Sequence, residues 1–176
     1  MILWINGITN LSYDDQVNTF RLLSAMMSDK CRLVFSADIT HDRDTILKAY
    51  NDDEGCSRTF IQHAIVRLNK DEGSQIALTS FKYAVDFISD NNPDKMSFVR
   101  AYIQATRNIR YPIPGLGIDL QMKKGERLYF HEGAGFSCKY TLEQLQYMVE
   151  KAGLRLEKTW TDDKKRVVFC QCTKTS

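Results

Sequence analysis

The sequence predicts an α/β fold in which a parallel sheet with crossover helices is interrupted by an antiparallel insertion. Three observations predict this fold. Within the first seventy residues, apolar runs and helical periodicity follow in the order strand–helix–strand–helix–helix, which is typical of parallel sheets. Residues 81–88 then change to a period of two. The chain ends in two apolar runs around a polar turn, which indicates an antiparallel edge.

The N-terminal part carries two strands and three helices. Residues 2–6 and 31–38 are largely apolar runs, and such runs are typical of strands that are covered on both faces. Ser12 offers a cap for the first helix, and Thr40 or Asp42 offers one for the second. A third helix is predicted from apolar side chains at helical spacing, namely Phe60, Ile61, Ala64, Ile65 and Leu68.

The middle of the chain is predicted to be an inserted antiparallel sheet. Pro112 and Pro114 predict an irregular connection within it, and residues 91–94 predict a turn. The predicted strands are residues 81–88, 96–104, 116–122 and 127–132.

The C-terminal part is predicted to return to the first sheet. Thr141 caps a helix, with Gln144 placed for a capping box, and Gly153 ends that helix. Residues 154–160 and 166–172 are then predicted to be strands of a hairpin.

Composition excludes several classes of protein. The chain of 176 residues is 43% hydrophobic with a formal net charge of +2, as in an ordinary globular domain. Its basic residues are scattered, which argues against nucleic-acid binding. No apolar run approaches the roughly 18 residues of a membrane span, and the apolar start lacks the basic region of a signal peptide.

The five cysteines predict a reducing, cytoplasmic location. Their number is odd and their spacings are irregular, which argues against a disulfide framework. Cys170 and Cys172 could indicate a metal site, but no second Cys or His pair stands at ligand spacing. A buried strand explains both thiols instead.

The glycine and histidine patterns, taken alone, predict no chemistry. Residues 115–117 (GLG) follow two prolines and open no helix, and residues 133–135 (GAG) lack the third glycine of a dinucleotide loop. His41, His63 and His131 lie far apart, without a nucleophile or metal spacing. The residues by themselves therefore predict a fold class and no activity.

Several short segments, in order along nearly the whole chain, match one family pattern. The most specific is residues 47–52 (LKAYND), followed by Gly55 and Phe60. Together the segments resemble the histidine-specific methyltransferase family, which includes the ergothioneine-pathway enzyme and fungal relatives that methylate prenylated tryptophan. The other matches are 7–11 (GITNL), 36–42 (SADITHD), 68–69 (LN), 125–126 (GE), 137–141 (SCKYT), 152–154 (AGL) and 160–162 (WTD).

The resemblance implies a partial class I methyltransferase sheet, Rossmann-like, with an inserted α+β substrate-binding subdomain. It implies that residues 1–70 and 136–176 form the methyltransferase part, and that residues 71–135 form the insertion. It also implies S-adenosylmethionine as cofactor, an amino acid or derivative as the small-molecule substrate, and methyl transfer to the α-nitrogen. For the fungal relatives this means a role in secondary metabolism.

The resemblance assigns site residues by position. Asn6 and Gly7 match the cofactor end of the pocket, and Asn10 matches the asparagine that binds the amino-acid end of the substrate. An amide suits that task because it both donates and accepts hydrogen bonds. The alternative, weighted equally, is that Asn10 is only a neighbour of the helix N-cap. Tyr50 matches a substrate-binding tyrosine, with a core tyrosine as its alternative. Ser137 matches a substrate-binding serine.

Two departures bear on the substrate. Gly135 stands where the histidine enzyme has a glutamate that recognises imidazole, and losing a charged hydrogen bond costs about 1.5–3 kcal/mol, which disfavours histidine. Phe98 falls where the histidine enzyme has a methionine. An aromatic residue there, with glycine for glutamate, predicts a larger apolar group such as an indole.

A third departure concerns the start of the chain. The glycine-rich cofactor loop and the following acid of a class I methyltransferase are expected upstream of Asn10, and this sequence does not contain them. We therefore expect weak cofactor binding by this chain alone and an apolar edge strand at residues 2–6 that promotes self-association. A gene fragment, a chain completed by another chain, and a catalytically inactive binding or assembly module are the alternatives.

Overall fold

The computed structural model describes residues 2–5, 7–129 and 137–175. The chain divides into two compact units. Unit 1 comprises residues 1–43, 87–99 and 133–176, and unit 2 comprises residues 44–86 and 100–132. The predicted division at residues 70 and 136 concerns the family's domain organisation and stays a prediction.

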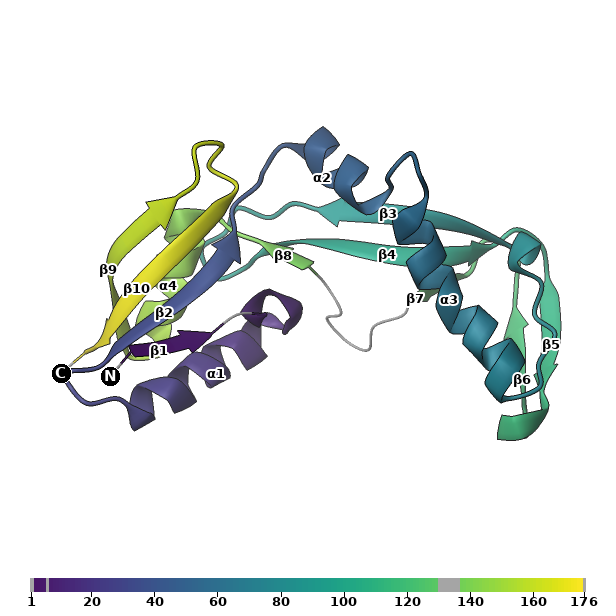
Figure 1. Cartoon of the computed structure of the whole chain (residues 1–176), viewed down its shortest axis with the longest axis horizontal. Coiled ribbons are helices and arrows are strands. Elements are labelled where there is room, and N and C mark those ends of the chain that lie inside the picture. The colour runs from purple at the N-terminus through teal and green to yellow at the C-terminus, as the bar shows by residue number, and fades with distance from the viewer. Residues whose placement is uncertain (1, 6, 130–136, 176) are drawn as a thin grey trace. The chain divides into compact units, whose positions relative to one another are not determined.

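Unit 1 contains a four-stranded sheet in the order β1 (Ile2–Ile5), β2 (Arg32–Asp38), β10 (Val167–Lys174), β9 (Leu154–Thr161). Strands β1 and β2 are parallel and are joined by α1 (Tyr13–Met26), as Figure 1 shows. Strand β10 runs antiparallel to both β2 and β9. The predicted α/β fold, with its crossover helix and C-terminal hairpin, is therefore confirmed.

Capping fixes where the two helices of this sheet begin. Ser12 is the N-cap of α1, and its hydroxyl accepts the backbone N–H of Asp15. Helix α4 (Leu142–Lys151) begins with a complete capping box, because Thr141 accepts the backbone N–H of Gln144 while the Gln144 side chain accepts the N–H of Thr141. Both caps agree with the sequence.

Helices α1 and α4 pack against each other and both contact β9, so they cover the same face of the sheet. Burial alternates along β2: Leu33, Phe35 and Ala37 are buried, whereas Ser36 and Asp38 are half-buried. Among the described residues, β2 thus has one fully buried face, which corrects the expected double covering. Polar residues in its C-terminal half explain the difference. The core of unit 1 includes Val17, Phe20, Leu33, Phe35, Leu145, Met148, Val149, Val168, Cys170 and Cys172.

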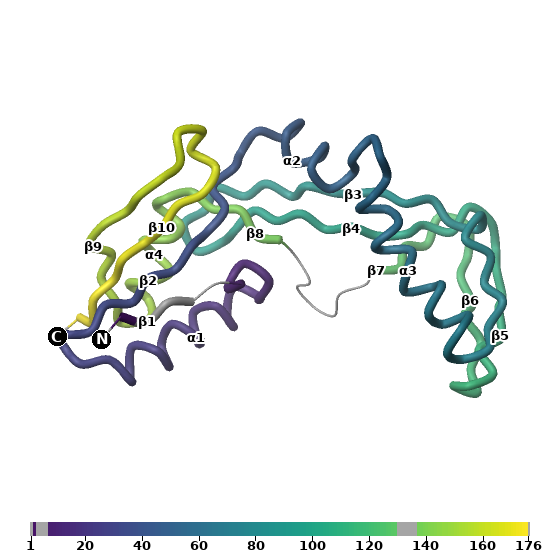
Figure 2. The backbone as a smooth tube through the Cα atoms, in the orientation of Figure 1, coloured from purple at the N-terminus to yellow at the C-terminus, as the bar shows by residue number. Residues whose placement is uncertain are grey.

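The middle of the chain forms two further sheets, and Figure 2 traces its path. One sheet has the order β3 (Phe81–Ile88), β4 (Ser97–Ala105), β7 (Arg127–Tyr129), and β8 (Ser137–Lys139) also pairs with β4. The other is the hairpin of β5 (Ile109–Ile113) and β6 (Ile118–Met122). The remaining elements are η1 (Ile8–Asn10), α2 (Arg43–Tyr50), α3 (Cys56–Asp71), η2 (Leu78–Ser80) and η3 (Pro114–Leu116).

One expectation about the middle of the chain is wrong. Pro112 lies within β5, opposite Asp119, rather than in an irregular connection. A proline fits there because both strands of a two-stranded sheet are edges. Helix α3 exists as predicted, but Phe60 is 78% exposed and Ala64 is exposed. Ile61 and Ile65 lie in the core of unit 2, so only some of the apolar side chains that indicated this helix are buried.

Candidate functional site

The parallel pairing of β1 and β2 brings their carboxyl ends together, and ligands of open α/β sheets bind at such ends. Three elements contact one another there, namely β2, β8 and η1, which follows β1. We call the polar or open positions at this edge of unit 1 the rim site. Its members are Gly7, Asn10, Asp38, Ser137 and Lys139.

Gly7 and Asn10 frame the η1 side of the rim site. Gly7 has a left-handed backbone (φ 84°) that favours glycine, and no atom lies within 4 Å of the place a Cβ would take. The side chain of Asn10 is exposed. The capping of α1 falls to Ser12, so the Asn10 amide is not its cap.

A buried network fixes η1 against β8. The fully buried Gln16 donates from Nε2 to the carbonyl oxygen of Leu11 at 2.8 Å, and its Oε1 accepts the Tyr140 hydroxyl at 2.6 Å. Burial, more than any other influence, raises the pKa of Tyr140, so its hydroxyl stays a donor. The network therefore ties the segment after Asn10 to the segment that carries Ser137.

A second network joins β2 to β8. Lys139 is almost completely buried, and its Nζ lies 2.8 Å from Oδ2 of Asp38. The same Nζ donates to Oγ of Ser137 at 2.9 Å. The other Asp38 oxygen accepts the backbone N–H of Thr40 at 2.8 Å. Asp38 and Lys139 thus hold Ser137 at the end of the parallel strands.

Sequence reasoning assigned no role to Asp38 or Lys139, although both lie in segments that carry the resemblance. Two signals could have indicated them: Asp38 is an acid at the end of an apolar strand, and Lys139 is a lysine two residues after Ser137. Residues two positions apart in a strand point to the same face. Lys139 and Ser137 therefore lie on one face of β8, where they form their hydrogen bond.

The strand register separates Phe98 from Ser137. Phe98 pairs with Cys138, and Val99 pairs with Ser137. Because paired residues share a face and neighbours alternate, Phe98 and Ser137 point to opposite faces of the β4–β8 ladder. The structure thus places Asn10 and Ser137 on contacting elements, η1 and β8, with Gly7 directly before η1. Phe98 lies on the face of the β4–β8 ladder opposite to Ser137.

The remaining predicted site residues are placed as follows. Tyr50 ends α2 in unit 2, where its carbonyl accepts the hydroxyl of Tyr83 at 2.5 Å. Burial raises the pKa of Tyr83 to about 12, so that hydroxyl also stays a donor. A pocket shared by Tyr50 and Ser137 stays a prediction, because the two belong to different units. Asn6 and Gly135 lie outside the described residues.

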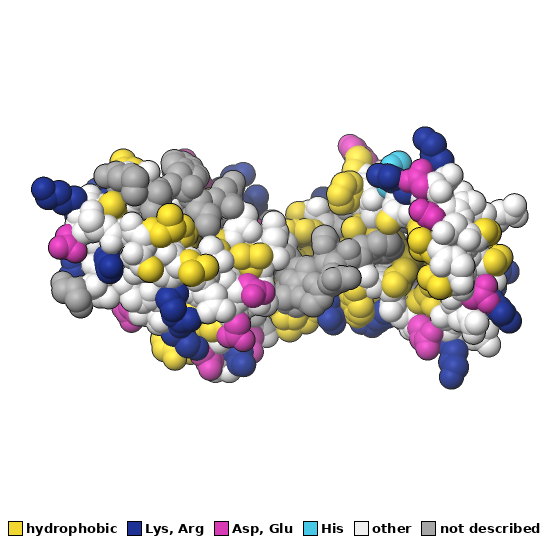
Figure 3. Space-filling view, turned by 90° about the horizontal axis from the view of Figure 1, so that it is seen from below, with side chains coloured by type: hydrophobic (Ala, Val, Ile, Leu, Met, Phe, Trp, Pro, Cys, Tyr) yellow, Lys and Arg dark blue, Asp and Glu magenta, His cyan; other side chains and the backbone are white. Residues whose placement is uncertain are grey.

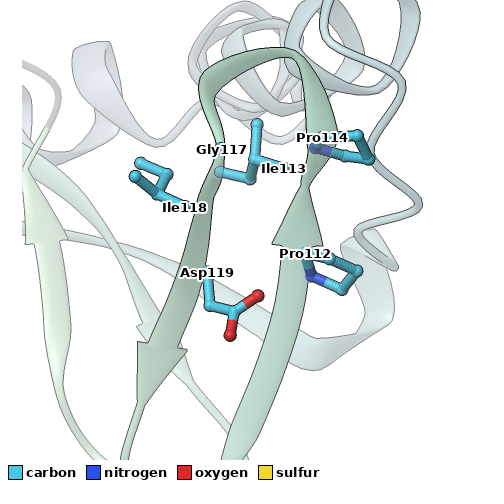
Figure 4. Close-up of a pocket in the computed structure, with 6 residues that line it drawn as sticks. All are labelled: Pro112, Ile113, Pro114, Gly117, Ile118 and Asp119. Atoms are coloured by element: carbon cyan, nitrogen blue, oxygen red, sulfur yellow. The ribbon is translucent and has the colours of Figure 1, made fainter.

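A separate hollow of about 370 Å³ lies at the turn of the β5–β6 hairpin. Figure 4 shows it with proline and isoleucine side chains and one carboxylate. That carboxylate, Asp119, is paired with Arg110 at 2.6 Å. The hollow is shallow and mainly apolar, and offers no converging polar groups for chemistry. It is lined by Pro112, Ile113, Pro114, Gly117, Ile118 and Asp119.

The described residues offer neither a metal-binding cluster nor a membrane-spanning helix. Within residues 2–5, 7–129 and 137–175, no three His, Cys, Asp or Glu side chains are grouped so that they could hold a metal ion. Cys170 and Cys172 are buried in β10. None of the helices that the structure describes has the length and apolar character needed to cross a membrane.

Comparison with known proteins identifies relatives of the whole chain. Residues 1–174 match the family described as histidine-specific methyltransferase, SAM-dependent. A histidine N-alpha-methyltransferase of Mycolicibacterium smegmatis (strain ATCC 700084 / mc(2)155) is 23% identical over 155 residues, which cover 88% of this chain and 46% of that protein. The chain thus spans about half the length of the curated relative that it matches.

Two solved structures are similar at low sequence identity. One is an S-adenosylmethionine-dependent methyltransferase from Clostridium acetobutylicum ATCC 824, with a TM-score of 0.44, 9% identity, and coverage of 99% of this chain and 58% of that one. The other is the CcbJ methyltransferase from Streptomyces caelestis, with a TM-score of 0.39, 11% identity, and coverage of 99% and 57%.

Proposed function

Because this chain belongs to the histidine-specific, S-adenosylmethionine-dependent methyltransferase family, we propose that it takes part in methyl transfer to the α-amino group of an amino acid or derivative. The observation that carries the proposal is the rim site. At the carboxyl ends of two parallel strands, an exposed amide (Asn10) and a hydroxyl held by a buried lysine (Ser137) lie on contacting elements. Both groups suit an amino-acid ligand.

The residues at the η1 side of the rim site fit S-adenosylmethionine. Gly7 follows β1, and the space beside its Cα is open, so a ligand can approach the backbone closely there. Gly7, with Asn6 before it, would border the cofactor. S-adenosylmethionine, when bound, supplies an activated methyl group.

The chain's own residues position the acceptor. The amide of Asn10 can bind both the amino and the carboxylate ends of an amino acid, and the Ser137 hydroxyl can bind a further polar group of the substrate. Such positioning is the main contribution of a protein to an in-line transfer, because it replaces an encounter in solution by a fixed approach. The amine must also be unprotonated to react, so a site that excludes water favours the reaction.

Within this proposal, the substrate side chain is indole-like. Gly135 offers no acid for imidazole, and Phe98 replaces a smaller apolar residue of the histidine enzyme. Phe98 faces away from Ser137 at its own strand position, so its part in the pocket is the weaker support, and the missing acid is the stronger.

The test combines binding with turnover. The full chain is incubated with millimolar S-adenosylmethionine and either L-histidine, L-tryptophan or a prenylated tryptophan, and mass spectrometry follows methylated product. We expect product from a tryptophan derivative, and its loss in Asn10→Ala but not in Asn91→Ala, an exposed control. Tight histidine binding by isothermal titration would overturn the indole proposal. Binding without any methylated product would instead favour a catalytically inactive binding module.

We also propose a cytoplasmic, reducing location. All five cysteines are unpaired, and four of them are buried. A fold that keeps its thiols free suits a compartment that holds thiols reduced. Localisation of a tagged full-length protein tests this, and secretion would contradict it.

A further inference from the structure

The buried lysine of the rim site is oriented by more than one partner. Lys139 ends β8, and its side chain is 2% exposed, whereas that of Asp38 is 36% exposed. Asp38 is itself held by the Thr40 backbone N–H, and the backbone N–H of Tyr140 donates to the Asp38 carbonyl at 3.0 Å. The lysine ammonium therefore has a fixed direction, and one of its N–H bonds is directed at Ser137.

This direction decides how Ser137 can bind a ligand. A serine hydroxyl has one proton to donate and two lone pairs to accept with. An ammonium has only protons, so Lys139 occupies a lone pair of Ser137 and leaves its proton for another partner. A hydroxyl that accepts from a cation also becomes a better donor, because hydrogen bonds in a chain polarise one another.

We propose that Lys139 is a positioning residue that makes Ser137 a hydrogen-bond donor, so that the rim site selects a substrate group that accepts a hydrogen bond. This inference rests on the proposed function, because it assumes that Ser137 touches the amino-acid substrate. The matching groups are a carboxylate oxygen or an unprotonated ring nitrogen. A protonated imidazole or an ammonium group is disfavoured next to Ser137.

A purely structural ion pair is the competing explanation. Lys139 and Asp38 tie β8 to β2, and removing either partner could distort the rim without any effect through Ser137. The two explanations differ in one respect. If Lys139 acts through the Ser137 hydroxyl, its contribution to ligand affinity must vanish when that hydroxyl is absent.

The experiment is a double-mutant cycle on ligand affinity in the full chain. Isothermal titration with L-tryptophan and with L-histidine is carried out on the wild type, Lys139→Met, Ser137→Ala and the double variant. We expect Lys139→Met to weaken binding about tenfold, as for a charged hydrogen bond, and to change it less than about twofold in the Ser137→Ala background. Lys158→Met, which removes an exposed lysine of β9, is the matched control and should leave affinity unchanged.

A second measurement covers the case in which Lys139→Met does not fold. With lysine labelled by ¹⁵N, the Lys139 ammonium signal is followed by NMR during the same titrations. We expect the signal to shift on saturation in the wild type, and to stay in place in Ser137→Ala. Two results would overturn the role of Lys139 while leaving the proposed function in place. One is a Lys139 signal that does not shift when ligand binds, and the other is an equal loss of affinity from Lys139→Met in the wild type and in Ser137→Ala. If the wild type binds neither amino acid, the proposed function fails and the inference fails with it.

Discussion

At the residue scale, the ion pair of Asp38 and Lys139 should dominate local stability. Removing Asp38 leaves the buried Lys139 charge without its carboxylate, and because Asp38 itself is 36% exposed the cost is less than that of a fully buried pair, about 2 kcal/mol. We therefore expect Asp38→Ala to lower the free energy of unfolding by that amount in chemical denaturation. The matched control is Asp71→Ala, which breaks the exposed pair with Arg67 and should cost about 0.5 kcal/mol or less. Similar losses of unfolding free energy in both variants would mean that another group or solvent compensates the Lys139 charge when Asp38 is removed.

The cysteines give a second prediction at this scale. Burial raises the pKa of both Cys170 and Cys172 to about 12, whereas Cys56 is exposed. Because the thiolate is the reactive form, Cys56 should be alkylated well before the two β10 cysteines in folded protein at pH 8. Mass spectrometry of peptides after a brief iodoacetamide pulse measures the order. Early labelling of Cys170 or Cys172 would show that β10, an inner strand of this sheet, becomes exposed to solvent readily.

At the scale of single elements, Asp52 should stabilise the start of α3 in a pH-dependent way. Its carboxylate accepts the backbone N–H groups of Cys56 at 2.6 Å and Ser57 at 2.8 Å. Hydrogen bonds from the Ser57 side chain and backbone, and then from the Cys56 backbone, hold the pKa of Asp52 well below its usual range. A depressed folded pKa means that the contribution is present above the unfolded pKa, about 3.9, and is lost as pH falls towards the folded value.

The corresponding variant is Asp52→Ala, with Asp53→Ala at the neighbouring exposed position as control. We expect a lower melting temperature for Asp52→Ala than for the control at pH 7, and a difference that shrinks as the pH falls below about 4. Melting followed by circular dichroism across this range measures it. A difference that stays constant with pH would indicate a role in packing rather than in charge.

Element prediction succeeded where the signal is local. Caps such as Ser12 and Thr141 depend on hydrogen bonds within one turn, so the sequence locates them well. It failed at Pro112, because a lone hairpin can accept a proline that a wider sheet could not. Periodicity also located α3, but it records which side chains are apolar and not which of them are buried, and Phe60 is exposed.

At the scale of the whole molecule, the parallel pairing of β1 with β2 could be predicted but the site only in part. The order of apolar runs implies a crossover, and a crossover places two carboxyl ends together. The pairing of Lys139 with Asp38 joins residues about a hundred positions apart, and no spacing rule in one sequence encodes such a contact. The same limit applies to Phe98 and Ser137, whose faces depend on the register of β4 against β8.

The sheet edge gives the last prediction. Among the strands that the structure describes, β1 has β2 on one side only, and an apolar edge strand is a template for pairing with another copy. Ile2 is 72% exposed on this edge. We expect the weight-average mass in sedimentation to rise with concentration, and Ile2→Lys to suppress the rise, because a charge on an edge opposes pairing.

The control variant separates edge pairing from general hydrophobic contact. Hydrophobic side chains also appear on the surface elsewhere (Figure 3), and Leu22 of α1 is 70% exposed, close to the exposure of Ile2. Leu22→Lys removes a similar apolar area without touching a strand, so it should leave self-association through the edge unchanged. Equal suppression by both variants would assign the association to apolar surface in general, and a constant mass at all concentrations would rule out pairing at β1.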